Sequence, residues 1–237
     1  MLWARALIIE PSNIGPMTAP TLPTVFHVAA WGLSFLALVL AARQLPWFKL
    51  RGDSEAQHVL FAAVLAVCVL RFAVFDRIPG LHLHFLGAGI VCLMFGAAFA
   101  LWVMALASLS AALSPAGVWL GLGPDFLACG LIPVLCLQAV RVQVERRFSG
   151  NPFVYVFLIA FFGAGAAVLV AQLFKAVVTA GLVEGAARDA TMGYLISAPL
   201  MVFGEAFLSG GALALMVAYR PRWVASFDDA RWLKKPD

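Results

Sequence analysis

Two of the four histidines in the chain, His82 and His84, stand one residue apart in the stretch GLHLHFLGAG. Imidazole nitrogen is a common ligand for nickel, cobalt, copper and zinc, so the pair is a candidate metal site. Residues two apart in a helix point about 200° away from each other, so both can hold one ion only where the chain is extended. Pro79 and Gly80 permit an extended segment before the pair. The alternative is that both histidines are polar side chains at the boundary of the long apolar run that follows.

Glu205 is a second candidate, because it lies deep inside the apolar stretch PLMVFGEAFLSGG. An ionisable side chain at that depth must face a partner or a cavity. Lys175, in the preceding apolar run, is a possible partner, although it lies nearer one end of its run. Two interpretations stay open: a role in joining helices or in a permeation path, and a purely structural network of buried polar groups.

Asp125 is the third candidate, in the stretch LGLGPDFLACG. It can supply an oxygen ligand to a metal, or it can cap the N-terminus of the helix that follows, where Asp is favoured. Capping is the preferred interpretation.

The composition places these residues in a membrane. Of 237 residues, 63% are hydrophobic and only 12% are charged, and the mean hydropathy is +0.96. These values predict an all-α polytopic membrane protein. The net charge of +4 is explained by cytoplasmic loops, so no nucleic-acid partner is expected. No GxGxxG, P-loop, HExxH or GxSxG motif occurs, so neither an enzyme nor a covalently bound cofactor is expected.

The third of six apolar segments, residues 83–113, decides the number of spans. As one helix it would be about 46 Å long at about 1.5 Å per residue, against a bilayer core of roughly 30 Å. It is either one tilted helix or two short helices broken near Gly96. The six segments are 25–42, 58–75, 83–113, 126–140, 152–182 and 193–219.

The distribution of Lys and Arg favours two short helices. Positive charges gather in 43–57, in 141–151 and after residue 219, and such segments are typically cytoplasmic. All three can share one side only if 83–113 crosses the membrane twice. We therefore expect about seven spans with short third and fourth helices, the N-terminus outside and the C-terminus in the cytoplasm.

This topology divides the chain into three parts and places the histidines. His27, His82 and His84 all come to the outer face, although they are far apart in sequence. Arg71 and Lys175 lie near outer span ends, where they can extend their charges to the interface. The parts are an extracytoplasmic lead (1–24), a single transmembrane domain (25–220) and a cytoplasmic tail (221–237).

Two central stretches resemble the CbiM/NikM family, the membrane substrate-binding subunits of energy-coupling-factor ABC transporters for cobalt and nickel. They are HFLGAGIVCLMFGAAFALWVMALASLSAAL and GVWLGLGPDFLACGLIPVL. The family has a His before Leu-Leu-Gly, then a helix pair broken at glycine, then a Gly-Ala-Asn turn. Residues 84–87 match the first element, Gly96 the break and 123–125 the turn, with Asp125 in place of Asn.

The C-terminal stretch PLMVFGEAFLSGGALALMVAYRPRWVASFDDARWL is similar to a branch of bacterial membrane proteins known as CbiM-like permeases. The resemblance covers about residues 25–233. It implies a multi-pass protein of the bacterial inner membrane that works in the lipid bilayer with a coupling membrane subunit and ATPase subunits on other chains. It also implies a divalent metal as substrate, nickel or cobalt before copper or zinc.

The family holds its ion with the N-terminal amine, a His at the second position and the His before Leu-Leu-Gly. This chain begins Met-Leu-Trp, so only His84 carries over. The expected metal ligands are then His84 with His82 and His27. The alternative function is an accessory or structural subunit of a larger membrane complex that has lost the metal site.

Overall fold

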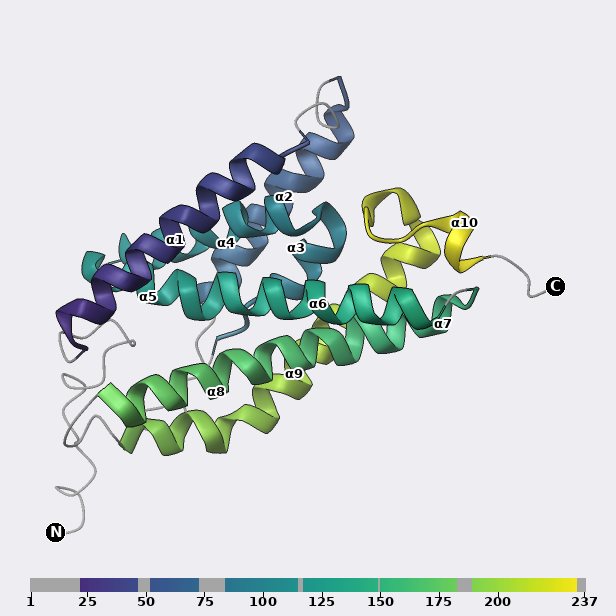
Figure 1. Ribbon diagram of the computed structural model, residues 1–237. Coiled ribbons are helices and arrows are strands. Elements are labelled where there is room, and N and C mark those ends of the chain that lie inside the picture. Colours follow the sequence, from purple (N-terminus) through teal and green to yellow (C-terminus); the bar gives the residue numbers. More distant parts are fainter. Residues whose placement is uncertain are drawn as a thin grey trace, which may run out of the picture.

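The computed structural model describes residues 22–46, 52–72, 84–114, 117–148, 150–182 and 189–233. Within these ranges every regular element is a helix (Figure 1), which confirms the all-α prediction. The elements are α1 (Thr24–Gln44), α2 (Ser54–Phe72), α3 (Ala88–Phe95), α4 (Ala97–Ala112), η2 (Trp119–Gly121), α5 (Leu122–Phe126), η3 (Leu127–Leu131), α6 (Ile132–Arg147), α7 (Pro152–Val154), η4 (Tyr155–Gly163), α8 (Ala164–Leu182), α9 (Asp189–Tyr219), η6 (Pro221–Trp223) and α10 (Asp229–Trp232).

Five helices among the described residues are long and apolar enough to cross a membrane, and α4 is a shorter apolar helix. The protein is therefore a polytopic membrane protein, as predicted. One span was predicted too short, at 126–140, because hydropathy marks only the apolar part of a helix whose polar end continues to Arg147. The five are Thr24–Gln44, Ser54–Phe72, Trp119–Arg147, Pro152–Leu182 and Thr191–Tyr219.

The predicted break in the long apolar run lies at Gly96. This residue has φ +88°, a backbone conformation that glycine adopts without strain, and it separates the 8 residues of α3 from the 16 of α4. At about 1.5 Å per residue α3 is only about 12 Å long, too short to cross a bilayer alone. Irregular backbone at such depth must be enclosed by protein, and the structure buries most of α3 together with Leu86 and Gly87 before it.

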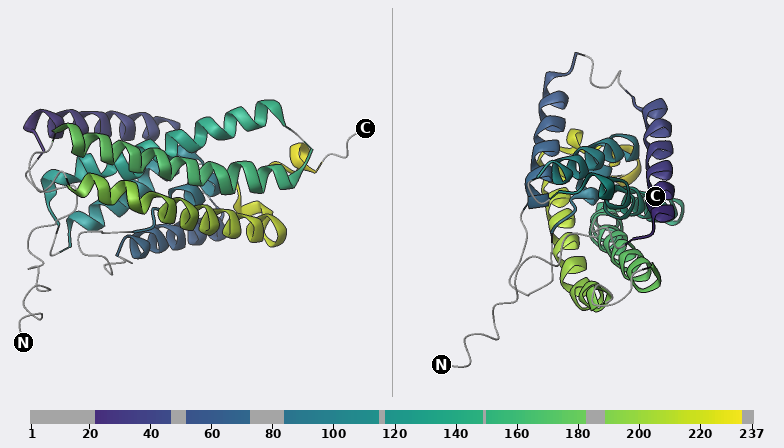
Figure 2. Two further views of the ribbon diagram at one scale, coloured as in Figure 1. Left: turned by 90° about the horizontal axis from the view of Figure 1, so that it is seen from below. Right: turned by 90° about the vertical axis from the view of Figure 1, so that its left-hand side faces the viewer.

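The charged segments gather at one end of the bundle. In the C-terminal tail, Trp223 donates through Nε1 to Glu55 at the start of α2, at 2.8 Å. The guanidinium of Arg231 donates to the carbonyl of Glu145, near the end of α6. Figure 2 (left) shows the tail in yellow at one end of the long helices. This convergence is what a double crossing of 83–113 requires, while the side facing the cytoplasm stays a prediction from charge.

The tail also completes α3. Because the helix breaks at Gly96, the last carbonyls of α3 lack partners in their own helix. Ala225 N–H donates to the carbonyl of Met94 at 2.9 Å and Ser226 N–H to that of Leu93 at 3.1 Å. The hydroxyl of Ser226 also donates to Leu93, at 2.7 Å. The tail is thus packed into the end of the bundle.

The core lies between α3, α4, η3, α6, η4 and α8, whereas α1 and α2 flank it. Only 22% of the apolar window of α1 and 11% of that of α2 is buried. Large apolar side chains such as Phe35 and Phe61, each 70% exposed, cover these two helices. In a membrane protein such surfaces face lipid, so α1 and α2 are lipid-facing helices.

Candidate substrate site

The segment that carries His84 is held in place by Glu205. The backbone N–H groups of Leu86 and Gly87 both donate to Oε1 of Glu205, at 3.0 Å for Gly87. These groups precede α3, where a helix leaves N–H groups unpaired and favours negative charge. Glu205 is 1% exposed. Its carboxylate therefore joins α9 to the segment before α3.

Two glycines allow this close fit. Gly87 has φ +67°, and a Cβ there would lie 3.2 Å from a methyl of Val67. At Gly204, next to Glu205, a Cβ would come within 2.6 Å of the Phe85 ring. These contacts of Glu205 fit both the helix-joining interpretation and the structural network of buried polar groups. The partnership with Lys175 considered from the sequence is not formed among the described residues, where Glu205 bonds to backbone instead.

Arg71 joins His84 to Asp125. Its Nη1 donates to Nε2 of His84 at 2.8 Å, and its Nη2 donates to Oδ2 of Asp125. Because a guanidinium only donates, Nε2 of His84 accepts and the imidazole is neutral with its proton on Nδ1. The other carboxylate oxygen of Asp125 accepts a bond from Cys129 Sγ at 3.7 Å. We call Arg71, His84 and Asp125 the Arg71 network.

The network corrects two expectations. Asp125 does not cap a helix: it lies within α5, whose N-terminus has no side-chain cap, and it pairs with Arg71. Arg71 and Lys175 do not reach the interface, because they are only 6% and 8% exposed. The side chains of the Arg71–Asp125 pair are 5% and 16% exposed. At such burial each charge compensates the other, since either alone would be strongly unfavourable.

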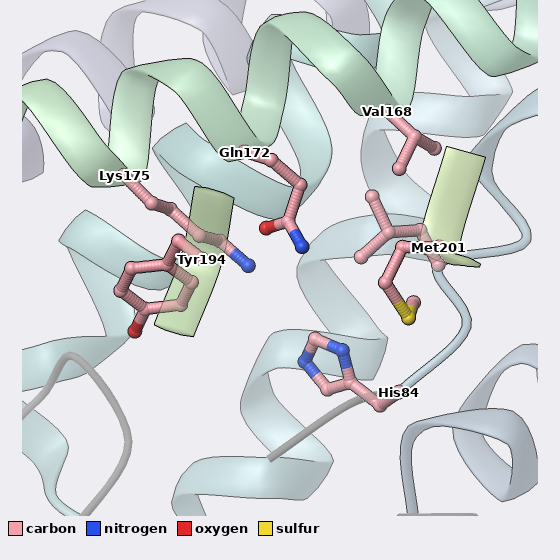
Figure 3. Close-up of a pocket in the computed structure, with 7 residues that line it drawn as sticks. His84, Val168, Gln172, Lys175, Tyr194 and Met201 are labelled. Atoms are coloured by element: carbon pink, nitrogen blue, oxygen red, sulfur yellow. The ribbon is translucent and has the colours of Figure 1, made fainter. Parts of the chain in front are cut away.

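A small cavity lies beside His84 (Figure 3). Its volume of about 20 Å³ is enough for one water-sized particle, which needs roughly 10–15 Å³. Figure 3 shows the side chains of Lys175 and Gln172 reaching from α8 toward the space that His84 faces from the opposite wall. The lining residues are His84, Leu86, Val168, Gln172, Lys175, Tyr194 and Met201.

The other two expected metal ligands are placed differently. His27 donates through Nδ1 to the carbonyl of Leu120 at 3.1 Å, which joins α1 to η2. Its Nε2 is buried and has no partner among the described residues. His27 and His84 lie in the same half of the bundle, because η2 leads directly into α5, which carries Asp125. His82 lies outside the described residues.

The described residues contain no group of three His, Cys, Asp or Glu side chains that could hold a metal ion. The site includes residues that the sequence analysis did not assign to it, namely Arg71, Cys129, Gln172 and Tyr194. Of these, only Arg71 carries a signal in the sequence, as a charge within an apolar run. The other three are ordinary residues of membrane helices and become recognisable only through their neighbours.

The fold and the site define a polytopic helical membrane protein with a small cavity in its bundle, lined by both polar and apolar side chains. The chain belongs to the CbiM family, described as the cobalt uptake substrate-specific transmembrane region, whose sequence model matches residues 18–223. This confirms the resemblance found in the sequence. The family consists of transporters rather than enzymes. The protein is therefore a multi-pass membrane protein of a metal-transport family.

Two solved structures share this fold. A crystal structure of a truncated transition metal transporter is similar with a TM-score of 0.66 and 15% identity, over 86% of this chain and 98% of that chain. A crystal structure of a transition metal transporter is similar with a TM-score of 0.64 and 14% identity, over 84% and 90%. At this identity the likeness concerns the fold. A comparison with curated protein sequences gives no match.

Proposed function

We propose that the chain is the substrate-binding membrane component of an energy-coupling-factor transporter for a divalent transition metal, cobalt or nickel. Membership of the CbiM family supports this proposal. One observation supports a location for the metal. His84 Nε2 and Asp125 Oδ2 both accept from one cationic group, the guanidinium of Arg71. An imidazole nitrogen and a carboxylate oxygen are also ligands for such metals.

The metal ion then competes with Arg71 for the same lone pairs. Entry of the ion displaces the guanidinium from His84 Nε2, and Asp125 stays available to either cation. His82 and His27 are the proposed further ligands. The buried Nε2 of His27 is suited to this role, because its Nδ1 holds the proton and its Nε2 therefore carries a lone pair.

The proposed setting is the bacterial inner membrane, with the N-terminus outside and the positively charged end of the bundle in the cytoplasm. No nucleotide-binding motif occurs in the chain. The energy therefore comes from ATPase subunits on other chains, through a coupling membrane subunit. The C-terminal tail and the end of α6 are the proposed contact surface for these partners. They form one continuous surface, because Arg231 of the tail donates to the carbonyl of Glu145 on α6.

The Arg71 network also favours a second function, in which no metal binds. Arg71 already donates to both His84 Nε2 and Asp125 Oδ2 within the chain, so these two atoms have a partner without a metal. An accessory subunit of a larger membrane complex, having lost its own metal site, is expected to have its former ligand atoms paired within the chain in this way.

Metal binding separates the two functions. The purified chain is tested in detergent for content of, and affinity for, cobalt and nickel, with copper and zinc as comparisons, beside His84→Ala and His58→Ala. His58 is exposed on α2 and has no place in the Arg71 network, so it controls for the loss of an imidazole. The transporter function predicts binding that His84→Ala weakens at least tenfold and His58→Ala leaves unchanged. Metal-free protein that copurifies in fixed ratio with a larger assembly would establish the accessory function instead.

A further inference from the structure

Lys175 is a buried cation that forms no ion pair among the described residues. It is 8% exposed. The two ion pairs of the described residues, Arg71–Asp125 and Arg141–Glu145, do not include it. Its ammonium lies 5.8 Å from the centre of the Tyr194 ring, a contact that offsets only part of the cost of burying a charge. A membrane span that keeps such a residue needs a negative charge near it.

The ammonium of Lys175 points into the cavity beside His84 (Figure 3). The side-chain amide of Gln172, one turn earlier on α8, points into the same space. No hydrogen-bond partner of this amide is found among the described residues, although Gln172 is only 6% exposed. The remaining walls include the apolar side chains of Leu86, Val168 and Met201. Among the described residues, the lining therefore presents one positive charge, an amide donor and no carboxylate.

The buried carboxylates nearby are already engaged. Asp125 accepts from Arg71, and Glu205 accepts two backbone N–H groups. Neither lines the cavity. A site inside the bundle strengthens the attraction between Lys175 and any negative group that enters, because solvent screens it less than at the surface. A divalent cation in the same place would meet the repulsion of Lys175.

We infer that this cavity binds a small anion, held by the ammonium of Lys175 and the amide of Gln172. With about 20 Å³ it takes one small anion or the charged end of one anionic solute. The inference goes beyond the proposed function. The metal and the anion occupy different atoms, so either can fail without the other.

The test measures the thermal stability of the purified chain in detergent as chloride or acetate replaces gluconate at constant ionic strength. Gluconate serves as the reference anion, because the hydroxyl and carbon chain next to its carboxylate are bulkier than the methyl group of acetate. A ligand that binds only the folded state raises the melting temperature, by about 3 °C when its concentration is well above its dissociation constant. A response to chloride alone identifies a free inorganic anion. A response to acetate identifies the carboxylate of a larger solute.

Two variants assign the response to the cavity. Lys175→Met is expected to abolish it, and Arg43→Met, the same loss of charge at an exposed position on α1, is expected to retain it. Gln172→Leu is expected to require about tenfold more anion and gives an answer even if Lys175→Met does not fold. The inference is overturned if the wild-type chain responds to neither anion, or if its response survives both Lys175→Met and Gln172→Leu.

Discussion

Arg71 on α2 donates through Nη1 to His84 Nε2 at 2.8 Å, from the same guanidinium that pairs with Asp125 on α5. Three segments that are distant in sequence thus meet at one cation. The arrangement holds His84 neutral with its proton on Nδ1, because a guanidinium cannot accept a hydrogen bond. The lone pair that a metal needs is therefore present, but it is occupied.

The first prediction concerns the stability that Arg71 provides. Arg71→Met leaves the Asp125 carboxylate buried without a counter-charge, so the free energy of unfolding should fall by about 3–5 kcal/mol. Thermal or denaturant unfolding in detergent measures this. The double variant Arg71→Met with Asp125→Asn should recover most of the loss, since no charge then remains unpaired. Equal stability of the single and double variants would contradict an ionic role for the pair.

The second prediction connects the same variant with metal binding. In Arg71→Met, His84 Nε2 and Asp125 Oδ2 lose their hydrogen-bond partner and become free to bind a metal. Cobalt or nickel should therefore raise the melting temperature of this variant more than that of the wild type. The proposed competition between guanidinium and metal requires this order. Arg71→Met combined with His84→Ala is the control and should show no metal-dependent shift. A shift that persists in the control would place the metal elsewhere.

The third prediction concerns Glu205. Glu205→Leu removes the acceptor of two buried N–H groups, and each unpaired group costs about 1–3 kcal/mol. Glu205→Gln keeps an oxygen in the same position and should cost about 1 kcal/mol or less, because a neutral acceptor still satisfies the backbone. The unfolding free energies of the two variants decide the matter. Equally large losses would mean that the negative charge, rather than the acceptor, holds the segment before α3.

Some of this architecture is accessible from the sequence. The apolar segments predict the polytopic helical fold, and the length of 83–113 together with the charge distribution predicts the break near Gly96. The family resemblance singles out His84 and Asp125 because their neighbours are distinctive. These signals are local, so a single sequence carries them.

The partners of these residues are not accessible in the same way. Whether Glu205 meets Lys175 or the backbone of Gly87 depends on how helices rotate about their axes. Hydropathy does not determine that rotation when most faces of a helix are apolar. For the same reason Arg71 was expected to reach the interface, although it turns inward to Asp125. The sequence shows which ionisable groups lie in apolar segments, and only the packing shows whether they are buried and which groups they pair with.

The fourth prediction concerns the helix break. Gly96 adopts φ +88° and has open space where a Cβ would be. Gly96→Ala should therefore cost about 1–3 kcal/mol through the backbone alone, without any clash. Gly211→Ala on α9 is the matched control: the space there is also open, but the backbone is helical, so alanine should be neutral or stabilising by up to about 1 kcal/mol. If both variants unfold alike, the break does not depend on the conformation of Gly96.

The last prediction concerns the C-terminal tail. The side chain of Trp232 is fully buried, and its ring lies 5.6 Å, centre to centre, from that of Tyr155. Trp232→Ala should cost about 3–5 kcal/mol of local packing. It should release the tail before the spans unfold, because the tail contacts only one end of the bundle. Limited proteolysis measures this: the tail should be cut in Trp232→Ala, while the wild type and Leu233→Ala, which alters a 57% exposed side chain, stay protected. Protection of the tail in Trp232→Ala would mean that the backbone bonds of Ala225 and Ser226 to α3 suffice to hold it.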